Sequence, residues 1–164
     1  MAHEGGGGVT ADEDLLAKVR ERLGPIALEA SRTAPRRLSV RVAPERAKEA
    51  VLILRDHVEC RHLSGINGFD TGDAIEVMYH MSARGGVVIT VHAALPRADP
   101  RIATVTDLLP SANLYERETR DLFGVEFDGH PDPRRLMLYE GWPEGEHPLR
   151  RDWKPKPQGG EPHA

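Results

Sequence analysis

The segment of residues 116–137 constrains this chain most, because it crowds charged side chains among apolar ones. Residues 116–121 read Glu-Arg-Glu-Thr-Arg-Asp, and Leu122 and Phe123 follow directly. Charges this dense, interleaved with apolar residues at helical spacing, cannot all remain solvated. Some of them must therefore find partners inside the fold or on another subunit.

A helix is predicted over residues 113–123, with a carboxylate on its apolar face. Leu114, Glu118 and Leu122 stand four residues apart, so Glu118 shares a face with the two leucines expected to anchor the helix. A carboxylate on that face needs a partner. If that partner lies inside the fold, we predict that Glu118→Ala destabilises the protein more than Glu116→Ala does.

Two interpretations of this helix remain open, and the first is a solvated, self-paired surface. Glu116 with Arg120, and Arg117 with Asp121, form i,i+4 pairs, each worth only about 0.3 kcal/mol when exposed. Such pairs stabilise a helix without implying a function.

The second interpretation ties the helix to the segment after His130. Glu118 and Asp121 would receive arginine side chains from that segment and so fix the surface presented to a neighbour. Arg134 and Arg135 are adjacent, and in an extended chain their side chains point to opposite faces. One can then pair inward while the other points outward.

Composition restricts the class of protein. The 164 residues suit one domain, and a net charge of -4 is not that of a typical nucleic-acid binder. No stretch approaches the roughly 20 apolar residues of a membrane span, and the N-terminus lacks a signal peptide's basic and apolar regions, so a cytoplasmic location is expected. Cys60 is the only cysteine, which excludes an internal disulfide and a four-thiolate iron–sulfur cluster held by this chain alone.

Apolar periodicity predicts an α+β fold. Thr10 and Glu13 form a capping box that starts a first helix, and Gly24-Pro25 stops it. Further elements are expected as a strand at residues 37–42, a helix from Pro44 to about His57, and a hairpin of strands at residues 75–81 and 87–92. This order predicts a two-layer α+β domain with a mixed β-sheet packed against helices.

The second half of the chain adds shorter elements and an extended C-terminal arm. A short helix is expected at residues 102–109, Ser111 can cap the helix at residues 113–123, and Gly124 ends it. Residues 125–127 are strand-like. The chain is divided into a flexible N-terminal tail at residues 1–9, the α+β domain at residues 10–140, and the Pro/Gly-rich arm and tail at residues 141–164.

The arm carries a basic and aromatic segment at residues 147–156. It holds four Arg or Lys residues against one Asp, with Trp153 among them. Arg and Trp often anchor interfaces, and nearby prolines lower the entropy cost of ordering the segment. The arm therefore either docks on a partner, lies on its own domain or stays disordered.

One weak metal-site candidate precedes the central strands. His57, Glu59, Cys60 and His62 bring two imidazoles, a thiol and a carboxylate into six residues, a set that supplies three zinc ligands if the side chains converge. No Gly-x-Ser-x-Gly nucleophile motif and no phosphate-binding Gly loop is present in the sequence. The sequence thus shows no catalytic apparatus.

The charged segment resembles the signature of the thirty-kilodalton subunit family of respiratory complex I. That pattern is Glu-Arg-Glu, two variable residues, an acid, two apolar residues, six variable, His, three variable, a basic residue, one variable and two apolar. It is filled here by Glu116–Glu118, Asp121–Phe123, His130, Arg134 and Leu136–Met137. The run from His147 to Trp153 resembles the family's ending, and the similarity extends over about residues 12–154.

Departures from the pattern concern the arm. Pro133 replaces a usual leucine, Arg151 replaces a usual lysine, and residues 143–146 lengthen the link to His147. The chain also stops soon after the arm, unlike the fused form that continues into the large quinone-site subunit, so that subunit is expected on another polypeptide.

The resemblance implies a non-catalytic structural and assembly subunit of an enzyme, a proton-translocating NADH:quinone oxidoreductase. It implies that this subunit has no catalytic, cofactor-binding or metal-binding residues of its own. It implies a hetero-oligomer with the large quinone-site subunit and an iron–sulfur subunit, peripheral on the cytoplasmic face of the cell membrane. Iron–sulfur clusters, flavin, NADH and quinone are expected in partner subunits, and membrane contact only through the complex. The expected subunit interface comprises Glu116, Arg117, Glu118, Asp121, His130, Arg134, Arg135, His147, Arg150, Arg151, Asp152 and Trp153.

Two alternatives remain. Relatives of this family occur in membrane-bound nickel–iron hydrogenases and deazaflavin-dependent dehydrogenases, and one subunit does not separate these from complex I. The other alternative is a free-standing adaptor or metal-binding protein that uses His57, Cys60 and His62.

Overall fold

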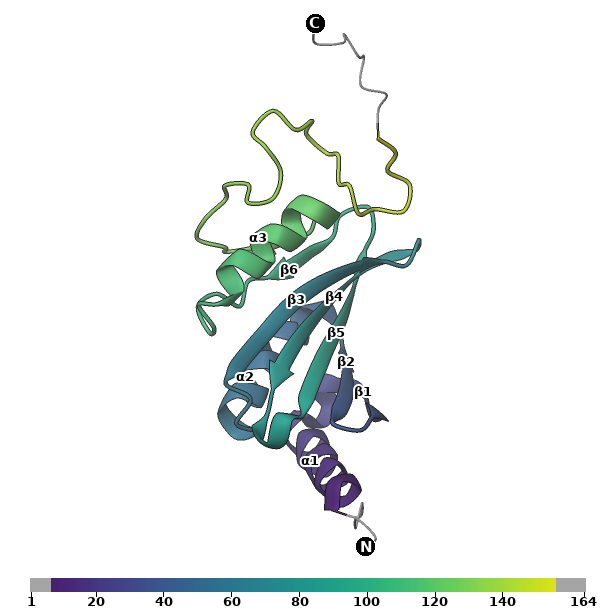
Figure 1. The fold of residues 1–164 in the computed structure, drawn as a ribbon, viewed down its shortest axis with the longest axis vertical. Coiled ribbons are helices and arrows are strands. Elements are labelled where there is room, and N and C mark those ends of the chain that lie inside the picture. The colour runs from purple at the N-terminus through teal and green to yellow at the C-terminus, as the bar shows by residue number, and fades with distance from the viewer. Residues whose placement is uncertain (1–6, 156–164) are drawn as a thin grey trace, which may run out of the picture.

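A mixed five-stranded sheet forms the centre of the molecule (Figure 1). The computed structural model describes residues 7–155, so residues 1–6 and 156–164 of the two predicted tails lie outside the described residues. The strand order is β1 (Ala27–Ala34), β2 (Arg37–Val42), β5 (Val88–Pro96), β4 (Ala74–Ser82) and β3 (His62–Asp70). β2 and β5 are parallel and the other neighbours antiparallel. The predicted α+β fold with a mixed sheet is confirmed.

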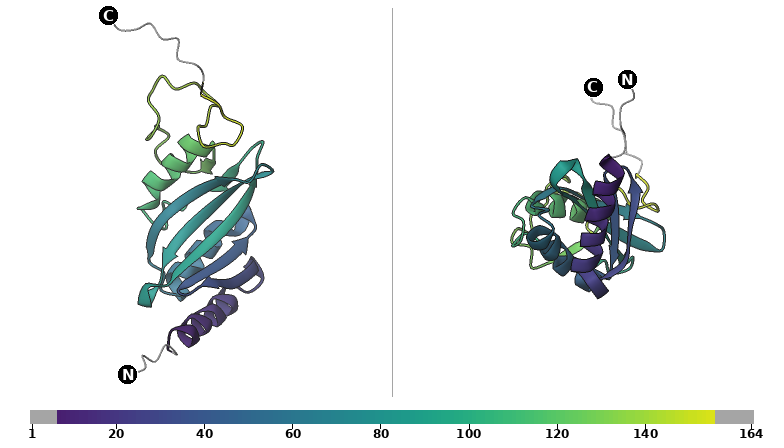
Figure 2. Two further views of the ribbon diagram at one scale, coloured as in Figure 1. Left: turned by 45° about the vertical axis from the view of Figure 1, so that its right-hand side comes forward. Right: turned by 90° about the horizontal axis from the view of Figure 1, so that it is seen from below.

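Two helices cover one face of this sheet. These are α1 (Gly7–Leu23) and α2 (Ala47–His57), which pack against each other and against the strands (Figures 1 and 2). Ile75, Val77 and Tyr79 alternate along β4 on the covered face and are fully buried. Such alternation is what an antiparallel strand with one packed face requires.

The opposite face of the sheet carries polar pairs. Glu76 on β4 accepts a hydrogen bond from Arg41 on β2 at 3.0 Å, and His92 Nδ1 on β5 lies 3.2 Å from the same carboxylate oxygen. Polar side chains of β2, β5 and β4 therefore pair across this face.

The strand, helix and hairpin predicted for residues 37–92 are present. β2 has the predicted bounds, Pro44 opens a 3₁₀ turn (Pro44–Arg46) that leads into α2, and β4 pairs with β5 in antiparallel register. Gly85 and Gly86 both have positive φ in the connecting turn (Arg84–Gly86), a conformation that glycine adopts without steric cost.

Two predictions about individual elements were wrong, and two strands, β1 and β3, were not predicted from the residue pattern. α1 begins at Gly7, so Thr10 lies inside the helix and cannot be its N-cap. β1 was not predicted, because its sequence of small and polar residues lacks apolar alternation. Residues 102–109 are not a helix: Ile102 lies in β6 (Arg101–Ala103), and Leu109 N–H closes a single turn on Val105 O.

A second unit packs at one end of the sheet, remote from α1 (Figures 1 and 2). It contains α3 (Ala112–Phe123) and a parallel pair of short strands, β6 and β7 (Glu126–Asp128). α3 lies along the edge strand β3, where Thr119 Oγ1 donates to Ile66 O. The helix thus covers an edge that would otherwise be open to pairing with another chain.

The ends of α3 agree with the prediction only in part. Gly124 ends the helix in the left-handed conformation (φ 72°), as predicted. Ser111 precedes the helix, but its side chain makes no capping hydrogen bond. Residues 141–155 contain no helix or strand, and none of the helices within residues 7–155 is long and apolar enough to cross a membrane.

We predict that Gly68→Ala destabilises the fold. A Cβ at Gly68 on β3 would lie 2.4 Å from the Phe123 ring of α3, so the helix and the strand edge must separate, at a cost of about 1–3 kcal/mol. Thermal unfolding of the variant should show a lower Tm.

Gly65→Ala is the matched control in the same strand. The nearest atom to its Cβ is Asn67 Oδ1 at 3.6 Å, an ordinary contact, so its Tm should stay close to that of the wild type. Equal Tm values for the two variants would contradict the close packing of α3 on β3.

Candidate functional site

Glu116 is the buried carboxylate of α3. Its side chain is 0% exposed, its Oε1 accepts the Val105 N–H at 2.8 Å, and its Oε2 accepts the Thr104 hydroxyl. Burial raises the pKa of Glu116 to about 7, and the two hydrogen bonds oppose that shift. The residue joins α3 to the chain at the end of β6.

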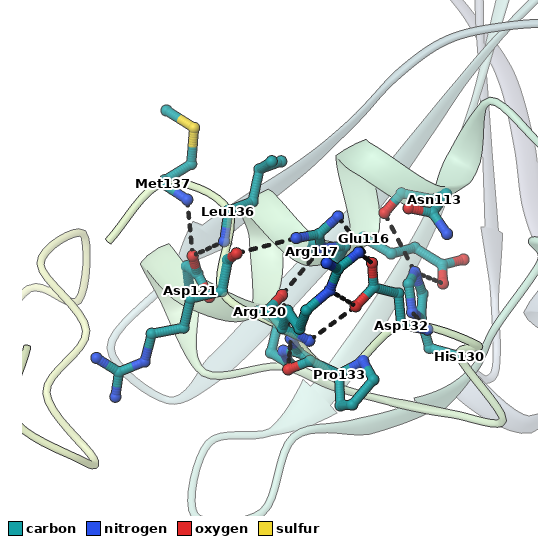
Figure 3. A network of polar contacts seen from close by, with 12 residues as sticks. Asn113, Glu116, Arg117, Arg120, Asp121, His130, Asp132, Pro133, Leu136 and Met137 are labelled. Atoms are coloured by element: carbon teal, nitrogen blue, oxygen red, sulfur yellow. Dashed lines mark hydrogen bonds and ion pairs between the residues drawn. The ribbon is translucent and has the colours of Figure 1, made fainter. Parts of the chain in front are cut away.

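His130 lies beside Glu116. Its Nδ1 accepts the Asp132 N–H at 3.0 Å, and its Nε2 lies 3.1 Å from Asn113 O and 3.9 Å from Glu116 Oε2 (Figure 3). An accepting Nδ1 places the ring proton on Nε2, which donates to Asn113 O. His130 therefore fixes the loop after β7 against the first turn of α3.

Two arginines of α3 hold the loop that follows His130. Arg117 donates to Arg134 O and Arg135 O, both at 2.9 Å, and pairs with Asp132 at 3.1 Å. Arg120 donates to Pro133 O, and also to Arg134 O at 3.0 Å (Figure 3). The backbone carbonyls of this loop therefore accept hydrogen bonds from the guanidinium groups of Arg117 and Arg120.

Asp121 holds the next part of the same loop with the opposite polarity. Its Oδ2 accepts the backbone N–H groups of Leu136 and Met137, both at 2.8 Å, and of Leu138 at 3.3 Å (Figure 3). Three amides converging on one carboxylate oxygen fix the loop's path over the helix.

The helix is therefore tied to the segment after His130, but not by the predicted pairs. Arg134 pairs with Asp132 at 2.7 Å, and Arg135 donates to Trp142 O at 2.6 Å and Tyr139 O at 3.3 Å. Neither arginine reaches Asp121 or Glu118. The predicted pairs Glu116–Arg120 and Arg117–Asp121 were also wrong, because each of these side chains has another partner.

The start of the basic arm segment caps the C-terminus of α3. His147 Nδ1–H donates to Asp121 O at 3.0 Å, the Leu149 N–H donates to Leu122 O at 3.1 Å, and Arg150 Nε donates to Phe123 O at 2.8 Å. Of the open interpretations of the arm, the structure has it lying on its own domain.

The end of the arm is fixed by a carboxylate that the sequence pattern did not single out. Asp70 is 2% exposed at the end of β3, where it accepts the Arg151 N–H at 3.0 Å and pairs with Arg97 at 3.0 Å. Arg97 also pairs with Asp152 at 2.6 Å. Hydrogen bonds from Arg97 hold the pKa of Asp70 well below its usual range. The large apolar residues of β3, Leu63, Ile66 and Phe69, stand three apart and do not alternate, so no pattern marked this carboxylate as buried.

Trp153 belongs to a small aromatic group within the arm. It stacks on Trp142 with ring centroids 5.8 Å apart, and its Nε1–H donates to Glu146 at 3.2 Å. Tyr139 packs edge-on against Trp142 at the same centroid distance, 5.8 Å. The arm keeps its shape through these rings as well as through its contacts with α3.

Glu118 is the exception among the predicted interface residues. It is half-buried, and its side chain makes no hydrogen bond or ion pair with any residue that the structure describes. The helix is rotated relative to the prediction, so that Ala112, Glu116 and Thr119 face inward while Leu114 is 55% exposed.

The weak metal-site candidate does not assemble. Cys60 is buried, its Sγ–H donates to Val58 O at 3.8 Å, and burial raises the pKa of its thiol to about 12. His57 and His62 are exposed. Within residues 7–155, no three His, Cys, Asp or Glu side chains converge as metal ligands would.

Comparison with known proteins gives consistent results. The family model for the respiratory-chain NADH dehydrogenase 30 Kd subunit matches residues 40–159. An NADH-quinone oxidoreductase subunit of Acidothermus cellulolyticus is 38% identical over 91% of this chain and 78% of its own length. An F(420)H(2) dehydrogenase subunit of Methanosarcina mazei is 34% identical over 88% of this chain and 90% of its own.

A solved structure is similar to this chain in fold and in sequence. A chain of the membrane-bound sulfane sulfur reductase, an archaeal respiratory membrane complex, superposes with a TM-score of 0.77 at 26% identity. The match covers 88% of this chain and 86% of that chain.

We predict that Glu116→Ala destabilises the protein more than Glu118→Ala, the reverse of the order expected from the sequence. Removing Glu116 leaves the buried Val105 N–H without an acceptor and forfeits the Thr104 bond, at a cost of about 1–3 kcal/mol. Glu118→Ala removes no described contact, so urea unfolding should place its midpoint near that of the wild type. Equal losses would contradict the structural role of Glu116.

We also predict that Glu116 makes stability fall as the pH rises. Its pKa is raised from 4.5 to about 7 in the fold, so between these values the native state binds more protons than the unfolded state. The contribution is fully present below about pH 4.5 and is lost as the pH passes 7. Lys48 lowers this pKa and Asp107 raises it, each less than burial does.

The measurement is the urea midpoint at pH 5 and pH 8 for Glu116→Gln and for Glu118→Gln as control. Glu116→Gln should flatten the pH dependence, whereas Glu118→Gln should keep the wild-type slope. An unchanged slope in Glu116→Gln would assign the dependence to another group.

Proposed function

Because the chain belongs to the family of the respiratory-chain NADH dehydrogenase 30 Kd subunit, we propose that it is a non-catalytic assembly subunit of a proton-translocating NADH:quinone oxidoreductase. In this role it docks on the large quinone-site subunit, close to an iron–sulfur subunit, on the cytoplasmic face of the membrane. Flavin, NADH, quinone and iron–sulfur clusters belong to the partner subunits.

The distribution of exposed apolar side chains carries this proposal. Five of the seven large hydrophobic residues exposed within the described chain lie on α3 or on the segment that wraps it. We call these five the arm face: Leu114, Leu136, Met137, Tyr139 and Leu149. Their exposed fractions range from 39% to 66%. Exposed apolar side chains gathered in one part of a molecule mark protein–protein contacts.

The charged residues around the arm face support a structural role. Arg117, Arg120 and Asp121 bind backbone groups of the loop, and His147 and Arg150 bind carbonyls of α3. Side chains engaged in this way hold a surface in shape and are poorly placed to transfer protons or bind a substrate. Catalysis is accordingly assigned to the partner subunits.

The same surface suits a related complex, and the relative from Methanosarcina mazei gives this second candidate weight. In that case the chain is the equivalent subunit of an F(420)H(2) dehydrogenase or of a membrane-bound nickel–iron hydrogenase. The identity of the electron-input subunits separates the candidates.

The test is affinity purification of the tagged full chain from detergent-solubilised native membranes, followed by mass spectrometry. A large quinone-site subunit, a cluster-bearing subunit and NADH-oxidising subunits are expected. Hydrogenase or F(420)H(2)-oxidising subunits would select the second candidate. Recovery of the chain alone from the soluble fraction would reject the assembly role and favour a free-standing adaptor.

We predict that acidic substitutions on the arm face abolish recovery of the large subunit. The double variant Leu114→Asp and Met137→Asp buries two carboxylates in the proposed contact, costing about 2 kcal/mol or more, roughly 30-fold in affinity. Deleting residues 141–164 is less informative, because the deletion also removes the caps of α3.

Leu28→Asp is the matched control. Leu28 is 71% exposed on β1, distant from α3 (Figure 1), so this variant should recover the large subunit as the wild type does. Both variants should keep the wild-type Tm. Undiminished recovery with the double variant would exclude the arm face from the contact.

A further inference from the structure

Glu118 stands apart from the other ionisable residues of its helix. α3 carries five Asp, Glu and Arg side chains. Four of them, Glu116, Arg117, Arg120 and Asp121, form hydrogen bonds with residues that the structure describes. Glu118 is half-buried and has no hydrogen bond or ion pair with any residue in the described part of the chain.

The surroundings of Glu118 on the helix surface are mainly apolar. Leu114, Tyr115 and Leu122 lie four residues before, three before and four after it, the spacings at which side chains are neighbours on an α-helix. Leu114 is 55% exposed, and Tyr115 and Leu122 are half-buried. Tyr115 and Leu122 also pack against the core, so Leu114 is the exposed apolar neighbour of this carboxylate.

The chain's own arginines near α3 are engaged elsewhere. Arg117 and Arg120 are bound to carbonyls of the 133–135 loop, and Arg135 donates to Tyr139 O and Trp142 O. Arg134 pairs with Asp132 at 2.7 Å. No described cation therefore neutralises Glu118 within this chain.

We propose that Glu118 receives an arginine or lysine side chain from the partner subunit, whose apolar neighbours pack on Leu114. The inference rests on the proposed assembly role and names the chemistry of the partner's contact. Docking on this face removes water from Glu118, and an ionised carboxylate is strongly disfavoured there unless a cation replaces the water. A partner that covers the apolar neighbours must consequently bring a cation with them.

A bound metal ion is a poor alternative occupant. The nearest carboxylates on the helix, Glu116 and Asp121, already accept hydrogen bonds from Val105 N–H and from the Leu136 and Met137 amides. A single carboxylate does not supply the ligands that Mg²⁺ or Ca²⁺ requires. A guanidinium or ammonium group needs only one acceptor of this kind, and its aliphatic stem suits the leucines.

Charge reversal at this position tests the proposal. Glu118→Arg places like charges together on docking and should reduce recovery of the large subunit by about tenfold or more. The isolated variant should keep the wild-type Tm, because Glu118 makes no described contact. Glu13→Arg is the matched control, since Glu13 is an exposed residue of α1 at the other end of the molecule (Figure 2).

A second measurement identifies the contact directly. A photo-crosslinking amino acid at position 118 of the full chain, irradiated in the assembled complex, should capture a partner peptide that contains Arg or Lys beside apolar residues. A captured peptide without a basic residue, or wild-type recovery by Glu118→Arg, would overturn the inference and leave the proposed function intact. If the wild-type chain itself recovers no partner, the proposed function and this inference fall together.

Discussion

The C-terminus of α3 is the point on which the second half of the molecule depends. An α-helix leaves its last four carbonyls without partners inside the helix, and here these belong to Arg120, Asp121, Leu122 and Phe123. Gly124 N–H satisfies the first, and the arm satisfies the other three through His147, the Leu149 N–H and Arg150. One helix end thereby fixes a segment some 25 residues further along the chain.

The close approach of arm and helix explains why Gly124 is needed there. Its φ of 72° is one that glycine adopts readily, and an added Cβ would lie 2.4 Å from His147 Nε2. The turn and the cap therefore require the same residue for two separate reasons. With Asp121 holding three loop amides on the adjacent side, the arm has a defined path although residues 141–155 form no helix or strand.

The sequence predicted those parts of the fold whose apolar pattern is regular, and missed the parts held by polar contacts. The strand at residues 37–42, α2 and the β4–β5 hairpin follow from alternation and from turn residues. β1 could not be found, because its mainly small and polar residues show no apolar alternation. Ile102, Val105 and Leu109 are all buried, so their spacing indicated burial correctly while the backbone formed a strand and a turn.

Helix α3 shows why the candidate site was only half predictable. A hydrophobic pattern selects Leu114 and Leu122 as anchors, but the helix buries Ala112, Glu116 and Thr119, and the two polar side chains find partners in Val105, Thr104 and Ile66. A carboxylate that is satisfied in the interior counts as polar in any such pattern, so the wrong face was chosen.

The rotation of α3 also decides which glutamate can serve an interface. Two hydrogen-bond donors hold Glu116 in the interior, and the same rotation turns Leu114 and Glu118 outward while Leu122 stays half-buried against the core. An exposed leucine leaves apolar area in water, and a partner that covers it also removes water from Glu118, an acid without a partner within residues 7–155, so both features carry a cost that the partner must offset. A partner with an apolar surface around one basic side chain removes both costs at once, which is why the two features point to the same neighbour.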